Sequence, residues 1–227
     1  MSRGSPVIYI PGILGSQLYL PEDGKKLWFS APAVLTDAKR LDIQSELSVK
    51  NNGVNLQNVS LLEKEYGVLK QDVFLVEWVC RTMPDSPVYF FSYDFRKSCR
   101  DNAEHLNKQI EELVSEGHSL VNIVCHSMGG LVTSAYAAKY GTDRLGKVVM
   151  LGVPFEGSYE IINTYMTGDI IMVPNAVADT VGITRDILRG FQSLAELMPS
   201  VRHLEASPLV KFGVPMSVGD MEDFLYS

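Results

Sequence analysis

Two short apolar runs on either side of a helix-forming segment constrain the fold of this 227-residue chain most strongly. Residues 120–126 (LVNIVCH) and 146–154 (GKVVMLGVP) have the length and composition of buried strands. Residues 128–140 between them favour a helix, which we expect to stop at Gly141. A strand, a helix and a strand in this order predict parallel crossover units in a sheet covered on both faces.

The first hundred residues extend this pattern. Residues 6–10 (PVIYI) form an apolar run that ends in a Pro-Gly turn, and residues 86–95 (SPVYFFSYDF) are aromatic and β-branched, so both segments predict strands. Residues 71–83 favour a helix with a buried face. The apolar positions expected on that face are Phe74, Val76, Trp78 and Val79.

A further helix is predicted between the second and third strands. Asp101 and Glu104 have the spacing of a capping box, so we expect the helix to begin there and to end at Gly117. Its apolar face consists of Leu106, Ile110, Leu113 and Val114. Four strands, all before residue 155, predict an α/β fold with a mostly parallel sheet covered by helices.

The remaining segments have no clean period. Residues 24–62 suggest a loop with short helical pieces, and the chain after residue 155 suggests helices around irregular loops, with 213–219 as one weak strand candidate. We therefore expect a core over residues 1–155, with a lid-like insertion at about 24–62. Residues 156–227 are expected to form a helical cap region.

Charge and cysteine content exclude some classes of function. The net charge of −7 and the pI near 5.1 argue against a nucleic-acid partner. Three cysteines are an odd number without metal-type spacing, which favours free thiols in a reducing compartment. No group of His, Asp and Glu has ligand spacing, so neither a metal nor another cofactor is implied. We find no signal peptide and no apolar run of membrane-spanning length, and the cytoplasm follows as the default location.

The sequence CHSMGG (125–130) predicts a nucleophile at Ser127. In the pattern Gly-x-Ser-x-Gly, the serine occupies a sharp turn between a strand and a helix, with small residues two positions before and after it. Gly129 meets the second requirement, and Cys125 is small enough to replace the first glycine. The alternative is an ordinary tight turn, which the strand and helix on either side make less favoured.

Two backbone amides are candidates for an oxyanion hole. The amide of Met128 opens the helix after Ser127, where helix N-termini favour negative charge. The second donor in this architecture comes from the loop after an early strand, and the sequence PGILG places Ile13 there. The simpler explanation of PGILG is a common Pro-Gly turn.

Six segments together resemble one known family. They are PGILGSQL (11–18), LWFS (27–30), YDFR (93–96), CHSMGG (125–130), GVPFEGS (152–158) and GFQSLAELMPS (190–200). In this order they are similar to motifs of the lecithin:cholesterol acyltransferase family of α/β-hydrolases, which includes lysosomal phospholipase A2 and phospholipid:diacylglycerol acyltransferase. Phe95 stands where the family motif has tryptophan.

The resemblance implies an α/β-hydrolase fold with a helical cap and an enzyme that acts on lipid esters. Ser127 would be the nucleophile, and the amides of Ile13 and Met128 would form the oxyanion hole. Trp28 would lie near the lid or the acyl site, or would simply be a packed tryptophan. For Asp94 and Arg96 we favour a structural ion pair over a catalytic one.

No segment matches the family's catalytic Asp and His, which follow later strands. We expect both to lie beyond Ser227 and the chain to be C-terminally truncated, with one edge of its sheet unpaired. The chain alone is then predicted to be weakly active or inactive, because serine without a base is a poor nucleophile.

Histidines within the chain offer weaker alternatives. His203 with Asp179 or Asp186 would keep the order Ser, Asp, His. His126 precedes the nucleophile, so we expect its side chain to point away from Ser127 and to serve packing and hydrogen bonding. His105 is expected on the exposed side of its helix.

Three functions remain open at this point. The leading one is a lipase, phospholipase or O-acyltransferase that works through an acyl-enzyme on Ser127. The second is a catalytically incomplete hydrolase-fold module that binds a lipid or a protein, and the third is a peptidase or thioesterase on the same fold. Residues 170–177 (IIMVPNAV) are either a lipid-surface contact or a cover over the cleft. The sequence predicts neither the oligomeric state nor the choice between hydrolysis and transfer.

Overall fold

A four-stranded parallel sheet forms the centre of the molecule. The computed structural model describes residues 4–28, 30, 38–50, 52–58, 70–168, 185–207, 209–211, 214–217 and 219–220. The strands run in the order β4-β1-β5-β6 and all neighbours are parallel. Their bounds are β1 Val7–Ile10, β4 Val88–Phe90, β5 Val121–His126 and β6 Leu145–Leu151. The four predicted strands and their parallel arrangement are confirmed.

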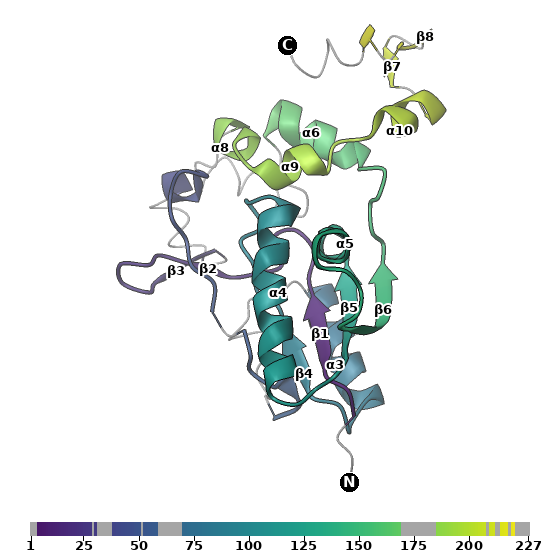
Figure 1. Cartoon of the computed structure of the whole chain (residues 1–227). Coiled ribbons are helices and arrows are strands. Elements are labelled where there is room, and N and C mark those ends of the chain that lie inside the picture. The colour runs from purple at the N-terminus through teal and green to yellow at the C-terminus, as the bar shows by residue number, and fades with distance from the viewer. Residues whose placement is uncertain are drawn as a thin grey trace.

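Helices cover both faces of this sheet. Helices α4 (Cys99–Ser115) and α5 (Met128–Tyr140) lie on one face, and α3 (Lys70–Thr82) lies on the other (Figure 1). Alternate residues of β1 serve the two sides, as strand geometry requires. Ile8 belongs to the large core with α4 and α5, whereas Tyr9 packs with Val76 of α3. The predicted layers of helix, sheet and helix are therefore present.

Helix α4 begins earlier than predicted. Its N-cap is Ser98, whose Oγ accepts a hydrogen bond from the Asp101 amide at 3.0 Å, so the predicted start at Asp101 is wrong by almost one turn. Side chains from a distant helix, α9 (Gln192–Glu196), also accept bonds from the Ser98 and Cys99 amides. The local sequence contains no sign of these partners. The predicted end is confirmed, because Gly117 has φ of 99°.

Helix α3 exists where it was predicted, but it is rotated about its axis. Its buried positions are Asp72, Val76 and Val79, whereas Phe74 and Trp78 are exposed. The prediction that Phe74 and Trp78 lie on the buried face is therefore wrong. Both stripes have helical spacing, so periodicity alone does not choose between them.

The region predicted as a loop with short helical pieces, residues 24–62, also contains one strand of a hairpin whose other strand lies just before it. Strands β2 (Leu18–Tyr19) and β3 (Lys26–Trp28) pair antiparallel. The short helices are η1 (Ala38–Leu41) and η2 (Leu56–Asn58), as expected. The hairpin was missed because its paired stretches are too short to show a period of two.

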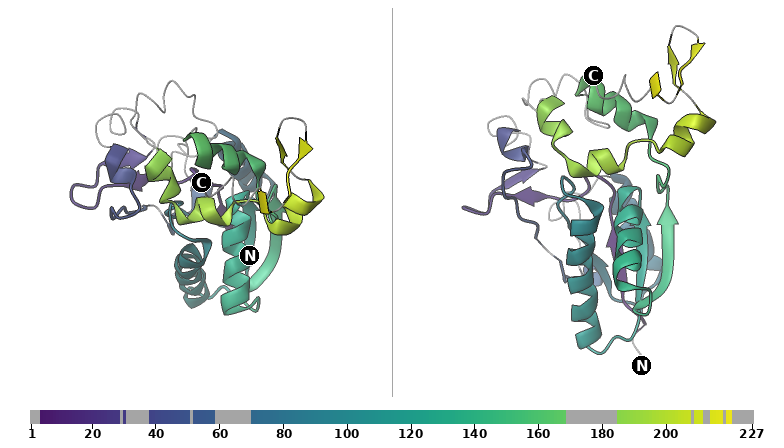
Figure 2. Two further views of the ribbon diagram at one scale, coloured as in Figure 1. Left: turned by 90° about the horizontal axis from the view of Figure 1, so that it is seen from above. Right: turned by 45° about the horizontal axis from the view of Figure 1, so that its top comes forward.

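Within the described residues, short helices lie beyond the carboxyl ends of the strands (Figures 1 and 2). They are α6 (Tyr159–Thr167), α8 (Arg185–Arg189), α9 and α10 (Val201–Ala206). Two strands of two residues each, β7 (Val210–Lys211) and β8 (Val214–Pro215), follow and pair antiparallel, and only β8 falls within the weak strand candidate at 213–219. Residues 170–177 fall outside the described ranges. None of the helices in the described ranges combines the length and the apolar character needed to cross a membrane.

Candidate active site

Ser127 occupies a strained turn between β5 and α5. Its φ is 51° and its ψ is −126°, a region that side-chain-bearing residues rarely adopt. Among the described residues, Leu14 is the one other non-glycine residue with positive φ, at 66°. Leu14 belongs to the segment Pro11–Gly15, which we call the glycine loop. One strained residue therefore lies in the glycine loop and the other in the turn at Ser127, the two segments that the sequence predicts to form the oxyanion hole.

Gly129 allows α5 to approach β1 closely. A Cβ at this position would lie 2.5 Å from the Ile10 carbonyl oxygen and 2.7 Å from the Pro11 carbonyl oxygen. The steric demand of the turn therefore falls on the glycine after the serine. Cys125 is buried in β5, and its Sγ donates to the Val149 carbonyl oxygen at 3.5 Å. This explains why a small side chain other than glycine fits two positions before Ser127.

The glycine loop packs directly against the serine. A Cβ on Gly12 would lie 3.0 Å from the Ser127 Cβ and 3.5 Å from its Oγ, so only glycine leaves this space open. The Gly15 amide donates to the Gly12 carbonyl oxygen at 3.1 Å and closes the turn. The Ile13 amide has no hydrogen-bond partner within the described part of the chain. Met128 is the first residue of α5, so its amide has no acceptor within the helix.

Two side chains hold the carbonyl groups of the glycine loop. The Tyr93 hydroxyl donates to the Pro11 carbonyl oxygen at 2.8 Å, and the Trp28 Nε1 donates to the Leu14 carbonyl oxygen at 3.1 Å. Ser16 adds a third tie, because its Oγ accepts from the Tyr93 amide at 3.0 Å. Trp28 is 4% exposed, and it does not line the pocket at Ser127. Its contact is with the loop beside the serine.

A buried carboxylate lies behind the turn. Asp72 is fully buried, and its Oδ1 accepts from the Tyr9 hydroxyl at 2.5 Å and lies 3.2 Å from His126 Nδ1. Burial and the nearby Asp72 carboxylate raise the pKa of Tyr9, so this phenol remains a donor. The predicted hydrogen-bonding role of His126 is met by Asp72, but the prediction that its side chain points away from Ser127 is wrong, because both residues line the same pocket. Sequence reasoning missed Asp72, which reaches the site from α3.

A pocket of about 300 Å³ opens at Ser127. Gly12, Ile13, His126 and Ser127 form one side of it, and α6 contributes Ile161 to the other. A smaller, wholly apolar crevice shares Ile13 and Ile161 with this pocket. The remaining residues that line the crevice are Leu14, Thr164, Leu188, Phe191 and Leu194. The nucleophile candidate thus lies in a pocket that adjoins an apolar crevice.

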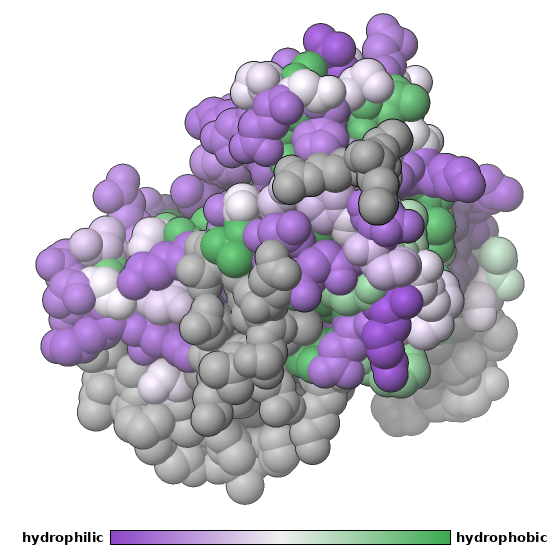
Figure 3. Space-filling model, turned by 90° about the horizontal axis from the view of Figure 1, so that it is seen from below, coloured by the Kyte–Doolittle hydropathy of each residue, from purple (hydrophilic) through white to green (hydrophobic). Residues whose placement is uncertain are grey.

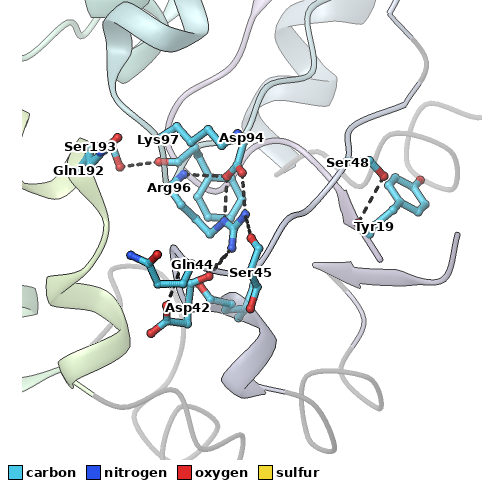
Figure 4. Close-up of polar contacts among 12 residues, drawn as sticks. Tyr19, Asp42, Gln44, Ser45, Ser48, Asp94, Arg96, Lys97, Gln192 and Ser193 are labelled. Carbon is cyan, nitrogen blue, oxygen red and sulfur yellow. Dashed lines mark hydrogen bonds and ion pairs between the residues drawn. The ribbon is translucent and has the colours of Figure 1, made fainter. Parts of the chain in front are cut away.

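Arg96, which follows β4, binds the backbone of residues 41–45 (Figure 4). Its guanidinium is fully buried, donates to both carboxylate oxygens of Asp94 at 2.9 and 2.7 Å, and also donates to the carbonyl oxygens of Leu41, Asp42 and Ser45. Both side chains are buried and paired with each other, as expected of a structural ion pair. The backbone next to Arg96 also contacts α9, because the Ser193 Oγ donates to the Phe95 carbonyl oxygen.

The other predicted partners lie away from the serine. His203 Nδ1 is 2.9 Å from the Glu156 carbonyl oxygen and its ring contacts Tyr159, and His203 does not line the pocket. Asp186 lies in α8, Asp179 falls outside the described residues, and His105 is exposed as expected. The part of the chain that the structure describes holds no cluster of three or more His, Cys, Asp or Glu side chains suited to a metal ion.

Comparison with known proteins assigns the chain to a family. Residues 57–212, more than half of the chain, match the family described as Lecithin:cholesterol acyltransferase. The chain belongs to this family. The resemblance seen in the sequence motifs is therefore confirmed.

Individual relatives are distant. "Lecithin-cholesterol acyltransferase-like 4" of Arabidopsis thaliana is 22% identical over 242 residues, which cover 93% of this chain and 44% of the relative. The chain thus spans less than half the length of that relative. The solved structure of a Tle4–Tli4 complex superposes with a TM-score of 0.66 and 19% identity, over 95% of this chain and 60% of the other. The mature Bacillus licheniformis lipase BlEst2 gives a TM-score of 0.45 at 14% identity, over 86% of this chain and 58% of the other.

The family and the topology agree on the fold. A parallel sheet covered by helices on both faces, with a serine at a strand-to-helix turn and short helices above it, is the α/β-hydrolase arrangement that the sequence predicts. The residues Ser127, Ile13 and Met128 come together at one end of this sheet. Trp28 is connected to these residues through its hydrogen bond to the Leu14 carbonyl oxygen.

Proposed function

We propose that the protein is a serine-dependent lipid acyl-ester hydrolase or O-acyltransferase that works through an acyl-enzyme on Ser127. The observation that carries the proposal is the strained backbone of Ser127, packed against Gly12. Strain of this kind persists where the surroundings enforce it, and it concentrates at functional sites. An ordinary tight turn would not require a glycine loop to lie against its serine.

In the proposed reaction, Ser127 Oγ attacks the ester carbonyl carbon while a base removes its proton. The carbonyl oxygen becomes an oxyanion, which the amides of Ile13 and Met128 stabilise at the N-terminus of α5. Collapse of this intermediate expels the alcohol and leaves the acyl group on Ser127. Water or a second alcohol then attacks the acyl carbonyl and regenerates the serine.

The apolar crevice beside the pocket is small, with a volume of about 20 Å³, so it suits only the part of an acyl chain nearest the ester. Apart from Thr164, it is lined by aliphatic and aromatic side chains from the glycine loop, from α6, α8 and α9, and from Phe191 between the last two. Seen from the opposite end of the molecule, hydrophilic side chains predominate among the coloured residues (Figure 3).

For the acid and base we propose residues outside positions 1–227, as the resemblance implies. Among the described residues, His126 is the one histidine that lines the pocket, and its Nδ1 faces Asp72. No hydrogen bond joins it to Ser127 in the described part of the chain. His203 is engaged elsewhere, which weakens it as an alternative.

The test is hydrolysis and acyl transfer by the full-length gene product, with medium-chain glycerides and phosphatidylcholine as donors and with and without a sterol or diacylglycerol acceptor. Ser127→Ala should lower turnover by at least about 10³-fold, since it removes the nucleophile. Ser134→Ala is the control, because Ser134 lies in the same helix and its Oγ bonds to the Gly130 carbonyl. Turnover that survives Ser127→Ala would overturn the proposal. Vesicle binding without any turnover would favour the binding module instead.

A further inference from the structure

The glycine loop is held at three of its carbonyl groups. The Pro11 oxygen accepts from the Tyr93 hydroxyl, the Gly12 oxygen accepts from the Gly15 amide, and the Leu14 oxygen accepts from the Trp28 indole. The donors come from the segment after β4, from the loop itself and from β3. Segments that are far apart in the sequence therefore fix the orientation of one short loop.

Because each peptide group is planar, these hydrogen bonds also set the direction of the Ile13 amide, the proposed oxyanion donor. In a trans peptide the C=O and N–H groups point in opposite directions. The Ile13 amide belongs to the same peptide as the Gly12 carbonyl, so the bond from Gly15 sets the direction of the Ile13 N–H. Tyr93 fixes the peptide before this one, and Trp28 fixes the peptide after Leu14. Rotation of the Gly12–Ile13 plane would have to break or bend one of these contacts.

We propose that Tyr93 is a positioning residue that aims the Ile13 amide at the oxyanion through its bond to the Pro11 carbonyl, with Trp28 as its counterpart on the other side. This inference rests on the proposed function, because it assumes that Ser127 forms a tetrahedral intermediate. It assigns a role to the tyrosine of the YDFR segment, whose Asp94 and Arg96 serve the neighbouring ion pair.

The surroundings of Tyr93 suit a permanent donor. Its side chain is 1% exposed and its ring stacks on Phe91 at 5.7 Å between centroids. Burial raises the pKa of the Tyr93 phenol well above its usual value, so the hydroxyl keeps its proton across the alkaline range. The backbone amide of Tyr93 donates to Ser16 Oγ, which fixes the tyrosine relative to the far end of the loop.

The bond is expected to affect the transition state more than substrate binding. Hydrogen-bond donors of an oxyanion hole act on charge that develops only during the reaction. A tilt of the Ile13 amide would weaken that interaction while the pocket and the crevice keep their shape. Complete loss of one donor costs about 10²–10³-fold in kcat, so partial misalignment should cost roughly 10-fold or more.

The experiment compares Tyr93→Phe with Tyr136→Phe in the full-length gene product. Tyr136 is a buried tyrosine of α5, which makes it a matched control outside the loop. With a p-nitrophenyl ester we expect Tyr93→Phe to lower kcat about 10-fold or more at nearly unchanged KM. Its affinity for an alkylboronic acid, which forms a tetrahedral adduct on serine, should fall in parallel. Tyr136→Phe should change neither.

A second variant protects the test against misfolding. Trp28→Phe removes the Nε1 donor and keeps an aromatic ring, and it should lower kcat in the same direction. A Tyr93→Phe protein with unchanged kcat and unchanged boronic acid affinity would overturn the proposal. So would equal losses in Tyr93→Phe and Tyr136→Phe. If Ser127→Ala leaves turnover intact, the proposed function itself has failed, which is a separate outcome.

Discussion

Strands β1 and β6 are both apolar parallel strands of one sheet, yet their surroundings differ completely. All four residues of β1 are fully buried between α3 on one side and α4 and α5 on the other. In β6, Val148, Val149 and Met150 are 37%, 48% and 38% exposed, and within the described residues β5 is the only strand that pairs with it.

This difference shows which part of the chain carries its stability and its site. Parallel strands are usually buried on both faces, so the apolar sequence of β6 suits a burial that the described residues do not provide. The glycine loop, the turn at Ser127 and the Tyr93 bond all depend on β1 and its neighbours. Substitutions around β1 should therefore be costly, and similar substitutions at β6 should be tolerated.

The largest difference is expected between two arginines. Arg96→Ala would leave Asp94 buried without its ion-pair partner and should lower the free energy of unfolding by about 3–5 kcal/mol. Arg144, just before β6, forms an exposed pair with Glu111 at 3.6 Å, and Arg144→Ala should cost less than about 1 kcal/mol. Urea unfolding of both variants measures the two losses. Similar losses in the free energy of unfolding for the two variants would contradict the difference between the buried surroundings of β1 and the exposed surroundings of β6.

The strands themselves provide the next comparison. Ile8→Ala in β1 creates a cavity in the core and should cost about 2–5 kcal/mol. Val149→Ala in β6 removes atoms that are half exposed and should cost less than about 1 kcal/mol. Thermal unfolding monitored by circular dichroism would rank them. A loss at Val149 as large as that at Ile8 would mean that β6 is covered in solution.

Two glycines sharpen the comparison further. Gly129→Ala would push a Cβ against backbone oxygens of Ile10 and Pro11 and should cost about 1–3 kcal/mol, together with loss of activity. In β6, Gly146→Ala would meet the Asn122 side-chain oxygen at 2.6 Å. A side chain can move where backbone cannot, so this variant should cost clearly less. Unfolding and turnover measured on the same samples would detect a reversed order.

The smallest expected effect concerns the thiols. Burial raises the pKa values of Cys125, Cys99 and Cys80, so each is almost entirely protonated at pH 8. Iodoacetamide should therefore modify the native protein slowly, with half-buried Cys80 ahead of the other two. Peptide mass spectrometry over time gives the three rates. Rapid alkylation of Cys125 would contradict its burial beside the serine turn.

The parts of the fold that depend on local periodicity could be predicted from the sequence. The four strands, the helix over 128–140 and the stop at Gly141 follow from patterns within a dozen residues. The start of α4 could not be found in this way, because Gln192 and Glu196 cap it from a distant helix. The buried face of α3 was also missed, since Phe74 and Val76 belong to stripes of equal spacing.

The same contrast between local sequence patterns and distant contacts holds for the candidate active site. Ser127 and the glycine loop carry recognisable short motifs, and the structure brings them within contact. Asp72 and the Tyr93 hydroxyl reach the site through tertiary packing, across 54 and 82 residues of sequence to His126 and Pro11. Neither contact leaves a local signature. The acid and base remain a prediction, because no described residue takes those roles.

The most direct test of the account is covalent labelling of the full-length gene product with a fluorophosphonate, followed by peptide mass spectrometry. We predict one adduct, on the peptide that contains Ser127, and its formation should be abolished by Ser127→Ala and slowed by Tyr93→Phe. An adduct on another serine, or labelling that persists in Ser127→Ala, would contradict the claim that the strained turn and the glycine loop form the active site.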